Sequence, residues 1–179
     1  MASEISKSRF LNTKEGFSGI KAVGFLPYQK TITLTTGDMF EGTGLTGSVY
    51  RYEVKNDGCN YDEEGKPDRN TGTTVYTGTL NLVLPILDRA TRDEVKLLAY
   101  GRPQIFVEKY DGTILLAGSE FGCELESIKI GTGGKRSDMS GFTLQFKSEE
   151  RRPIVYVGVT GSTVYNSSIN IVGGIQPAV

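Results

Sequence analysis

Two segments of the chain alternate between apolar and polar side chains, residue by residue. In TTVYTGTLNLVLP, residues 73–85, the apolar side chains that share one face are Tyr76, Leu80, Leu82 and Leu84. In FTLQFK, residues 142–147, the side chains of the apolar face are Phe142, Leu144 and Phe146. A period of two is typical of a half-buried strand, because successive side chains of a strand point to opposite faces of the sheet. These segments predict a mainly β fold.

Turn signals separate the strand-like segments. Glycine supplies 23 of the 179 residues, nearly twice its usual share of about 7%. Asp111-Gly112, between QIFVEKY and TILLAG, predicts a tight β-hairpin. In CELESIKIG, residues 123–131, the apolar phase moves by one residue, which predicts a β-bulge near Glu126 and Ser127.

One helix is expected among these strands, at about residues 88–100. Thr91 and Glu94 have the spacing of a capping box, in which each residue satisfies a free amide of the first turn. Gly101 is placed to end the helix in a left-handed conformation, and Pro103 prevents its continuation. The apolar stripe of this helix is Val95, Leu98 and Ala99. A short helix of this kind flanks an otherwise all-β body.

The length of 179 residues corresponds to one domain with extensions. Residues 1–16 form an N-terminal arm, whose apolar anchor includes Phe10, and residues 17–157 form the β domain. Residues 158–179 form a C-terminal strand and extension. Residues 56–72, NDGCNYDEEGKPDRNTG, show no apolar periodicity and are expected to be a long polar loop.

Several kinds of function are disfavoured by composition. The formal net charge of −1 gives no positive field for holding nucleic acid, and the absence of histidine removes the usual base and metal ligand. Cys59 and Cys123 lie far apart and suggest no disulfide framework. GTGGKRS, residues 131–137, has Arg136 where a phosphate-binding loop needs Ser or Thr. We therefore expect no enzyme, no cofactor and no metal, and, without a signal or membrane segment, synthesis in the cytoplasm.

The second half of the chain carries the phrase D-x-x-G-[YF]-T-L-x-F-x-[GS]-x-E-x-x-P. The residues that match it are Asp138, Gly141, Phe142, Thr143, Leu144, Phe146, Ser148, Glu150 and Pro153. With the helix, the G-x-P step and the hairpin that precede it, this order resembles virion tail proteins of bacteriophages, in the broad tail-tube-like group. The variant is similar to those of phages of gut Bacteroidetes, crAss-like phages among them. The resemblance covers about residues 85–157.

The resemblance implies an antiparallel β-barrel or sandwich of tail-tube type with one flanking helix. Subunits of this group assemble into a ring, usually a hexamer, whose inner barrel DNA traverses without sequence-specific binding. The long loop and the terminal arms reach neighbouring subunits and adjacent tail or neck proteins. The expected function is therefore a structural protein of the virion tail or neck, made in the host cytoplasm and acting without contact with a membrane.

Charged residues are the candidates for contacts between subunits. The proposed intersubunit residues are Glu149, Glu150, Arg151, Arg152, Asp62, Glu63, Glu64 and Phe10. Exposed charge pairs contribute about 0–1 kcal/mol each, so they would set the register of a contact more than its affinity. Two alternatives stay open: a monomeric β-sandwich module that binds host glycans, and a tube protein of a contractile injection or secretion system.

Overall fold

The computed structural model describes residues 17–30, 32, 34, 39–40, 49–55 and 57–158 of the chain. The predicted N-terminal arm with Phe10, and the C-terminal extension beyond residue 158, lie outside these residues. The described elements are β1 (Ile20–Leu26), β2 (Met39–Phe40), β3 (Tyr50–Glu53), β4 (Asn60–Asp68), β5 (Thr73–Pro85), α1 (Arg89–Tyr100), β6 (Gln104–Lys109), β7 (Ile114–Ala117), β8 (Glu124–Gly131), β9 (Gly141–Glu150) and β10 (Val155–Val157).

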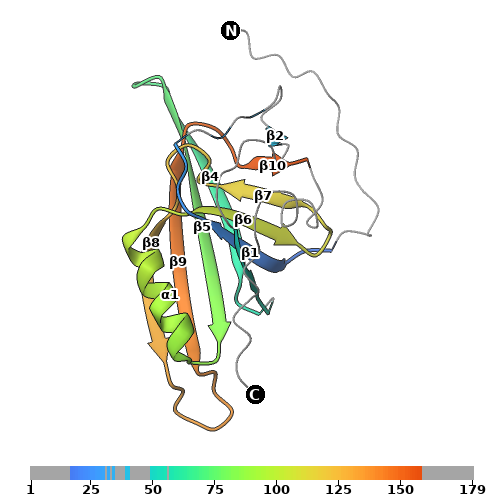
Figure 1. The fold of residues 1–179 in the computed structure, drawn as a ribbon. Helices are drawn as coiled ribbons and strands as arrows, with labels where there is room; N and C mark the ends of the chain where they lie inside the picture. The colour runs from blue at the N-terminus through green and yellow to red at the C-terminus, as the bar shows by residue number, and fades with distance from the viewer. Residues whose placement is uncertain are drawn as a thin grey trace.

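The strands form two sheets (Figure 1). Sheet A has six strands in the order β2-β10-β7-β6-β1-β3, and sheet B has four in the order β4-β5-β9-β8. Neighbouring strands are antiparallel, apart from the parallel pair β10–β2. The sandwich alternative is therefore confirmed. The barrel alternative is not, because β4 and β8 in sheet B, and β2 and β3 in sheet A, each end their sheet as the structure describes it.

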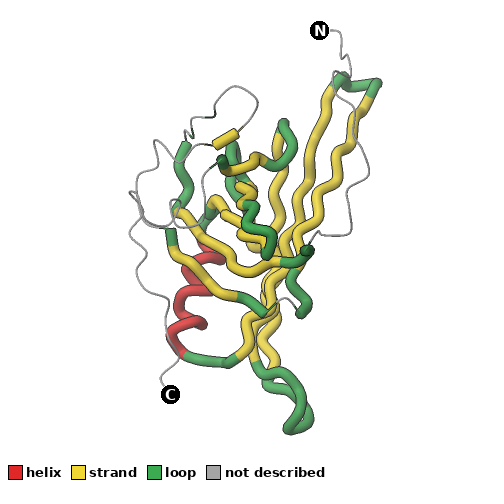
Figure 2. Tube along the Cα trace, turned by 90° about the vertical axis from the view of Figure 1, so that its right-hand side faces the viewer, coloured by secondary structure: helices red, strands yellow, loops and turns green. Residues whose placement is uncertain are grey.

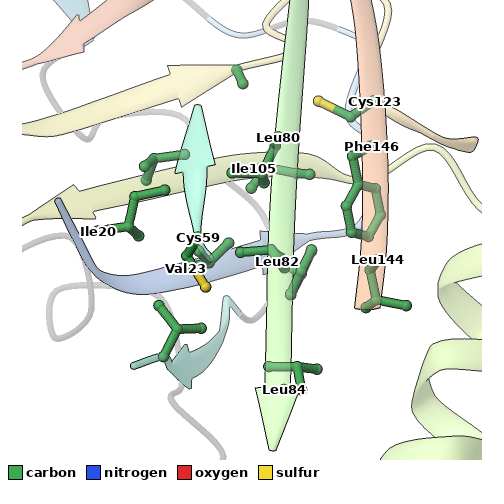
Figure 3. Close-up of a cluster of buried hydrophobic side chains, with 14 of the residues drawn as sticks. Ile20, Val23, Cys59, Leu80, Leu82, Leu84, Ile105, Cys123, Leu144 and Phe146 are labelled. Carbon is green, nitrogen blue, oxygen red and sulfur yellow. The ribbon is translucent and has the colours of Figure 1, made fainter. Parts of the chain in front are cut away.

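The core between the sheets is built on the two alternating segments. In sheet B, Leu80 of β5 lies opposite Phe146 of β9, Leu82 opposite Leu144, and Leu84 opposite Phe142. Figure 3 shows several of these side chains close to Val23 and Ile105, which come from β1 and β6 of sheet A. All of them are buried. Truncating one such side chain to alanine costs about 2–5 kcal/mol, so these pairs fix the sandwich.

Sheet A has a second core on its other face. Val107 contacts the core between the sheets, whereas its neighbour Phe106 belongs to a separate buried cluster with Phe40, Leu116 and Val155. Strand β6 is consequently buried on both faces. This explains why QIFVE shows no alternation in the sequence, since strands covered on both sides have continuous apolar runs.

The predicted polar loop 56–72 is largely strand, so this prediction was wrong. Strand β4 pairs with β5 over its whole length, from Asn60 opposite Asn81 to Asp68 opposite Thr73. Figures 1 and 2 show the tip of this β4–β5 hairpin reaching beyond the rest of the sandwich. The inward positions of β4 are occupied by tyrosine, glutamate and glycine, so the strand carries no apolar alternation for a pattern to detect.

Two local predictions are confirmed. Asp111-Gly112 forms the turn between β6 and β7, with Gly112 at a φ of +85° and the Asp111 carboxylate accepting a hydrogen bond from the Thr113 amide. The register of the β8–β9 pair shifts between Leu125 and Ser127, where the bulge was expected. The loop 132–140, which joins β8 to β9, projects from the end of sheet B opposite the β4–β5 hairpin (Figure 2).

The helix lies where it was expected, but its ends differ. The N-cap is Asp88, whose carboxylate accepts a hydrogen bond from the Thr91 amide at 3.0 Å, so Thr91 is inside the helix. Gly101 has φ −100° and ψ 176°, which is extended and not left-handed. The chain enters β6 directly through Pro103, and an extended path leads there without a reversal.

The cap makes a testable difference. Asp88→Ala should lower the free energy of unfolding by about 1 kcal/mol, because the Thr91 amide loses its acceptor. Glu94→Gln, which alters the other half of the predicted capping box, should leave the stability nearly unchanged. Urea unfolding followed by circular dichroism measures both. A larger loss from Glu94→Gln than from Asp88→Ala would contradict Asp88 as the N-cap.

Candidate functional site

The end of β9 turns an apolar inner face into a polar one. The inward positions of this strand are Phe142, Leu144, Phe146, Ser148 and Glu150, and all of them are buried. The first three belong to the core. The last, Glu150, is 7% exposed. The alternation that predicted the strand therefore also carries a carboxylate into the interior.

Glu150 binds the segment that crosses from β7 in sheet A to β8 in sheet B. Its carboxylate accepts hydrogen bonds from the backbone amides of Glu120 at 2.9 Å and Phe121 at 3.0 Å, and from the Ser119 hydroxyl at 3.4 Å. Burial raises the pKa of Glu150 above its ordinary value, although the two amides act in the opposite direction. The predicted intersubunit charge at Glu150 is thus engaged inside its own chain.

Glu63 has the same role at the other crossing. Its carboxylate accepts a hydrogen bond from the Ile154 amide, at 3.0 Å to one oxygen and 3.1 Å to the other, just before β10 begins. The Tyr61 hydroxyl donates to the same carboxylate at 3.2 Å. Burial raises the pKa of Tyr61, so this phenol remains a donor at neutral pH. Two carboxylates of sheet B therefore hold two of the segments that connect the sheets. Glu150 holds the segment before β8, and Glu63 holds the segment after β9.

The crossing loop 118–122 is also held from sheet A. The buried amide of Gln104 donates to the Ser119 carbonyl at 3.2 Å and to the Gln29 carbonyl at 3.0 Å. The Tyr28 hydroxyl donates to the Glu120 carbonyl at 2.8 Å. The loop begins and ends with glycines in the left-handed region, Gly118 at φ +71° and Gly122 at +78°. Its backbone is thus fixed from several directions.

The remaining predicted residues are divided between this loop and the outer face of sheet B. Arg152 forms an ion pair with Glu120 at 3.0 Å, and the Arg151 guanidinium lies 5.7 Å from the centre of the Phe121 ring. Glu149 pairs with Lys147 at 3.0 Å, Glu64 pairs with Lys66 at 3.0 Å, and Asp62 accepts a hydrogen bond from Asn60. The structure brings Glu150, Arg151 and Arg152 together around one loop, whereas Asp62, Glu64 and Glu149 lie on the outer face of sheet B.

The amides of the loop 132–140 and the two cysteines were the other candidates for chemistry. In the loop 132–140 the Asp138 carboxylate accepts hydrogen bonds from the amides of Gly134 at 2.9 Å and Lys135 at 2.8 Å. These are the amides that a phosphate would need. Cys59 and Cys123 are free thiols and both are buried, and burial raises the pKa of each. No helix in the described part of the chain is long and apolar enough to cross a bilayer.

Sequence reasoning missed Gln104 and Ser119, because nothing in a single sequence distinguishes a buried amide or hydroxyl from an exposed one. Glu150 did carry a signal. It is in phase with Phe142, Leu144 and Phe146, so the alternation itself places its side chain inward. Its charged neighbours, Glu149 and Arg151, concealed it.

The fold and this site define a mainly β, two-sheet sandwich whose sheets are joined through one buried carboxylate, Glu150, and one half-buried carboxylate, Glu63. No protein-family model, curated protein or solved structure was found to match the chain.

The role of Glu150 can be measured directly. Glu150→Ala leaves buried amides without an acceptor and should lower the free energy of unfolding by about 2–3 kcal/mol. Glu149→Ala, the adjacent exposed position, should change it by less than about 0.5 kcal/mol. Urea unfolding of both variants provides the comparison. Equal losses would contradict an internal role for Glu150.

The raised pKa of Glu150 gives a pH dependence of defined sign. A carboxyl whose pKa is higher in the folded state binds its proton more tightly there, so its contribution to stability is lost as pH rises through the folded pKa. Glu150→Gln removes this titration. The stability of the wild type minus that of Glu150→Gln should therefore fall as the pH rises above about 4, where the carboxyl of the unfolded chain ionises. A difference that increases with pH would show that the amides outweigh burial.

Proposed function

We propose that the chain is a structural virion protein of a phage tail or neck, which assembles head to tail into a ring through which DNA passes. The observation that carries this proposal is that both edges of sheet B are free in the described chain. The edges are β4, with nine residues, and β8, with eight. Long unpaired edges are templates for pairing with another chain, and a head-to-tail interface closes into a ring when its rotation allows.

The strand directions favour such an arrangement. All three pairs in sheet B are antiparallel, so β4 and β8 run in opposite directions. If β4 of a second copy lies beside β8 of the first, the new pair is antiparallel as well. A ring of copies would then contain one continuous antiparallel sheet.

Strand β8 also exposes apolar side chains at its free edge. Ile128 lies opposite Leu144 and Ile130 opposite Phe142, so both belong to the inner face of sheet B. They are nevertheless 42% and 54% exposed. A neighbouring strand at this edge would cover them, and each would contribute about 25 cal/mol for every Å² buried.

The outer face of sheet B suits a surface past which DNA slides. The residues paired on this face are mostly threonine, asparagine, glutamine and charged residues. The charged residues with a strand partner on this face are five carboxylates, Asp62, Glu64, Asp68, Glu124 and Glu149, and three ammonium groups, Lys66, Lys129 and Lys147. An excess of carboxylates repels phosphates, which supports passage of DNA without sequence-specific binding.

The phrase shared with tail proteins also has a structural reason in this chain. Gly141 packs against β5, where a Cβ would collide with the Leu84 carbonyl oxygen. Phe142, Leu144 and Phe146 supply the core face, and Glu150 holds the crossing loop. The matching positions are thus those on which sheet B and its connection to sheet A depend, which supports the resemblance as one of architecture.

The exposed edge of β8 provides the test of assembly. Ile128→Lys combined with Ile130→Lys should abolish the ring and leave a folded monomer, because both side chains are largely outside the core. Asn81→Lys, on the outer face of the inner strand β5 between Asn60 and Gln145, is the matched control and should still assemble. Light scattering after size exclusion and negative-stain imaging measure the outcome. A wild-type protein that stays monomeric, or that binds glycans as a monomer, would contradict the proposal.

A further inference from the structure

A hollow of about 520 Å³ lies on the outer face of sheet B, beside the crossing loop. The residues that matter for its chemistry are Val75, Arg102, Phe121, Glu124, Lys147 and Arg151. Strand β8 begins at Glu124, which pairs with Lys147, so residues 148–150 of β9 have no partner from β8 on that side. The hollow is thus found at the end of the β8 edge.

One wall of the hollow is rigid. Phe121 is 42% exposed, although its amide donates to the buried Glu150 carboxylate at 3.0 Å. The residue before it, Glu120, is held at its amide by Glu150 and at its carbonyl by the Tyr28 hydroxyl. A loop fixed by this many bonds presents its aromatic ring in one position, which lowers the entropic cost of binding against it.

Two guanidinium groups at the hollow have unused donors. Arg102 lies over the Tyr28 ring at 4.7 Å, and Arg151 lies over the Phe121 ring at 5.7 Å. Within the described chain, neither side chain forms an ion pair or hydrogen bond. A guanidinium that is stacked on a ring keeps its fork of N–H donors directed outward, where it matches a carboxylate in a bidentate pair.

The lining of the hollow carries equal numbers of basic and acidic side chains, three of each, but they differ in what they are bonded to. Glu150 is bonded to backbone amides, and Glu149 pairs with Lys147 at 3.0 Å. Glu124 is the acidic lining residue that is left to face Arg102 and Arg151. The donors of Arg102 and Arg151, and not a net charge of the hollow, therefore favour an occupant that carries carboxylates.

We infer that this hollow is the socket for strand β4 of a neighbouring copy, with the carboxylates of its Asp62 and Glu64 bound by Arg102 and Arg151. This inference rests on the head-to-tail ring proposed above. The rungs of sheet B run from Asp62 through Thr79 and Lys147 to Glu124. A neighbour that continues these rungs in register places its Asp62 beside Glu124, at the mouth of the hollow.

Glu64 of the neighbour then lies at the right level as well. It shares its rung with Thr77 and Glu149, and Glu149 lines the hollow. Asp62 and Glu64 are on the outer face, where the hollow opens. Register and face therefore agree on the same two carboxylates, and the guanidinium groups of Arg102 and Arg151 have to offset the like charges of Glu124 and Glu149 there.

A charge swap tests this socket. Arg102→Glu with Arg151→Glu should weaken self-association by about tenfold or more, and so should Asp62→Arg with Glu64→Arg. Mixing the two double variants should restore association, because each reversed socket then meets a reversed strand. Lys135→Glu with Arg136→Glu in the loop 132–140 makes the same change of charge away from the socket and should have no such effect. Sedimentation velocity measures association, and circular dichroism shows that each variant is folded.

The outcomes separate the socket from the ring. If both charge-reversed variants associate as the wild type does, or if mixing fails to restore association, the socket is overturned and the ring stands. If the wild type is monomeric, the ring is overturned, and a labelled peptide of residues 60–68 decides the socket by fluorescence anisotropy. Binding that is lost with Arg102→Glu and Arg151→Glu supports the socket. Absent binding, or binding unaffected by these changes, overturns it.

Discussion

The inner face of β9 has to meet two demands within ten residues. Its first three inward side chains, Phe142, Leu144 and Phe146, fill the core between the sheets. Its last, Glu150, must supply acceptors to a loop whose amides would otherwise be buried without partners. An unsatisfied buried amide costs about 1–3 kcal/mol, so a crossing between two packed sheets is feasible only where an acceptor is waiting. Strand β9 provides this acceptor at Glu150, an inward position of the same alternating pattern.

The two segments that connect the sheets, before β8 and after β9, are held in the same way: a carboxylate of sheet B accepts hydrogen bonds from their backbone amides. Glu63 on β4 receives the Ile154 amide, as Glu150 on β9 receives those of Glu120 and Phe121. Because β4 and β9 flank β5, the two carboxylates lie on the same sheet with one strand between them. Gln104 completes the connection from sheet A. The sheets are thus joined by polar contacts at the end of an apolar core.

How far the sequence predicts this architecture depends on whether a signal is local. Alternation was sufficient for β5 and β9, a turn dipeptide for the hairpin of β6 and β7, and a phase change for the bulge in β8. Strand β4 was not predicted, because it is stabilised by its pairing with β5 and has only one tyrosine and one glutamate at its half-buried inward positions. The choice between a barrel and a sandwich depends on which strand edges meet, and no local pattern records that. The candidate site was half predicted: its charges were noticed, but their inward phase was not.

The buried carboxylate of Glu150 and the β8 edge of sheet B are connected through the crossing loop. Glu150 fixes the backbone on one side of the loop, and the same loop presents Phe121 and stacks Arg151 on the other. A surface that recognises another copy must keep its shape before contact, because ordering side chains at the moment of binding reduces the affinity. The hydrogen bonds to Glu150 inside the sandwich therefore fix the backbone that presents Phe121 at the surface. The charged end of β9 thus has two sides that differ by the direction of the side chain: Glu150 points into the sandwich and bonds the loop, and Arg151, the next residue, lies over the Phe121 ring that the loop presents.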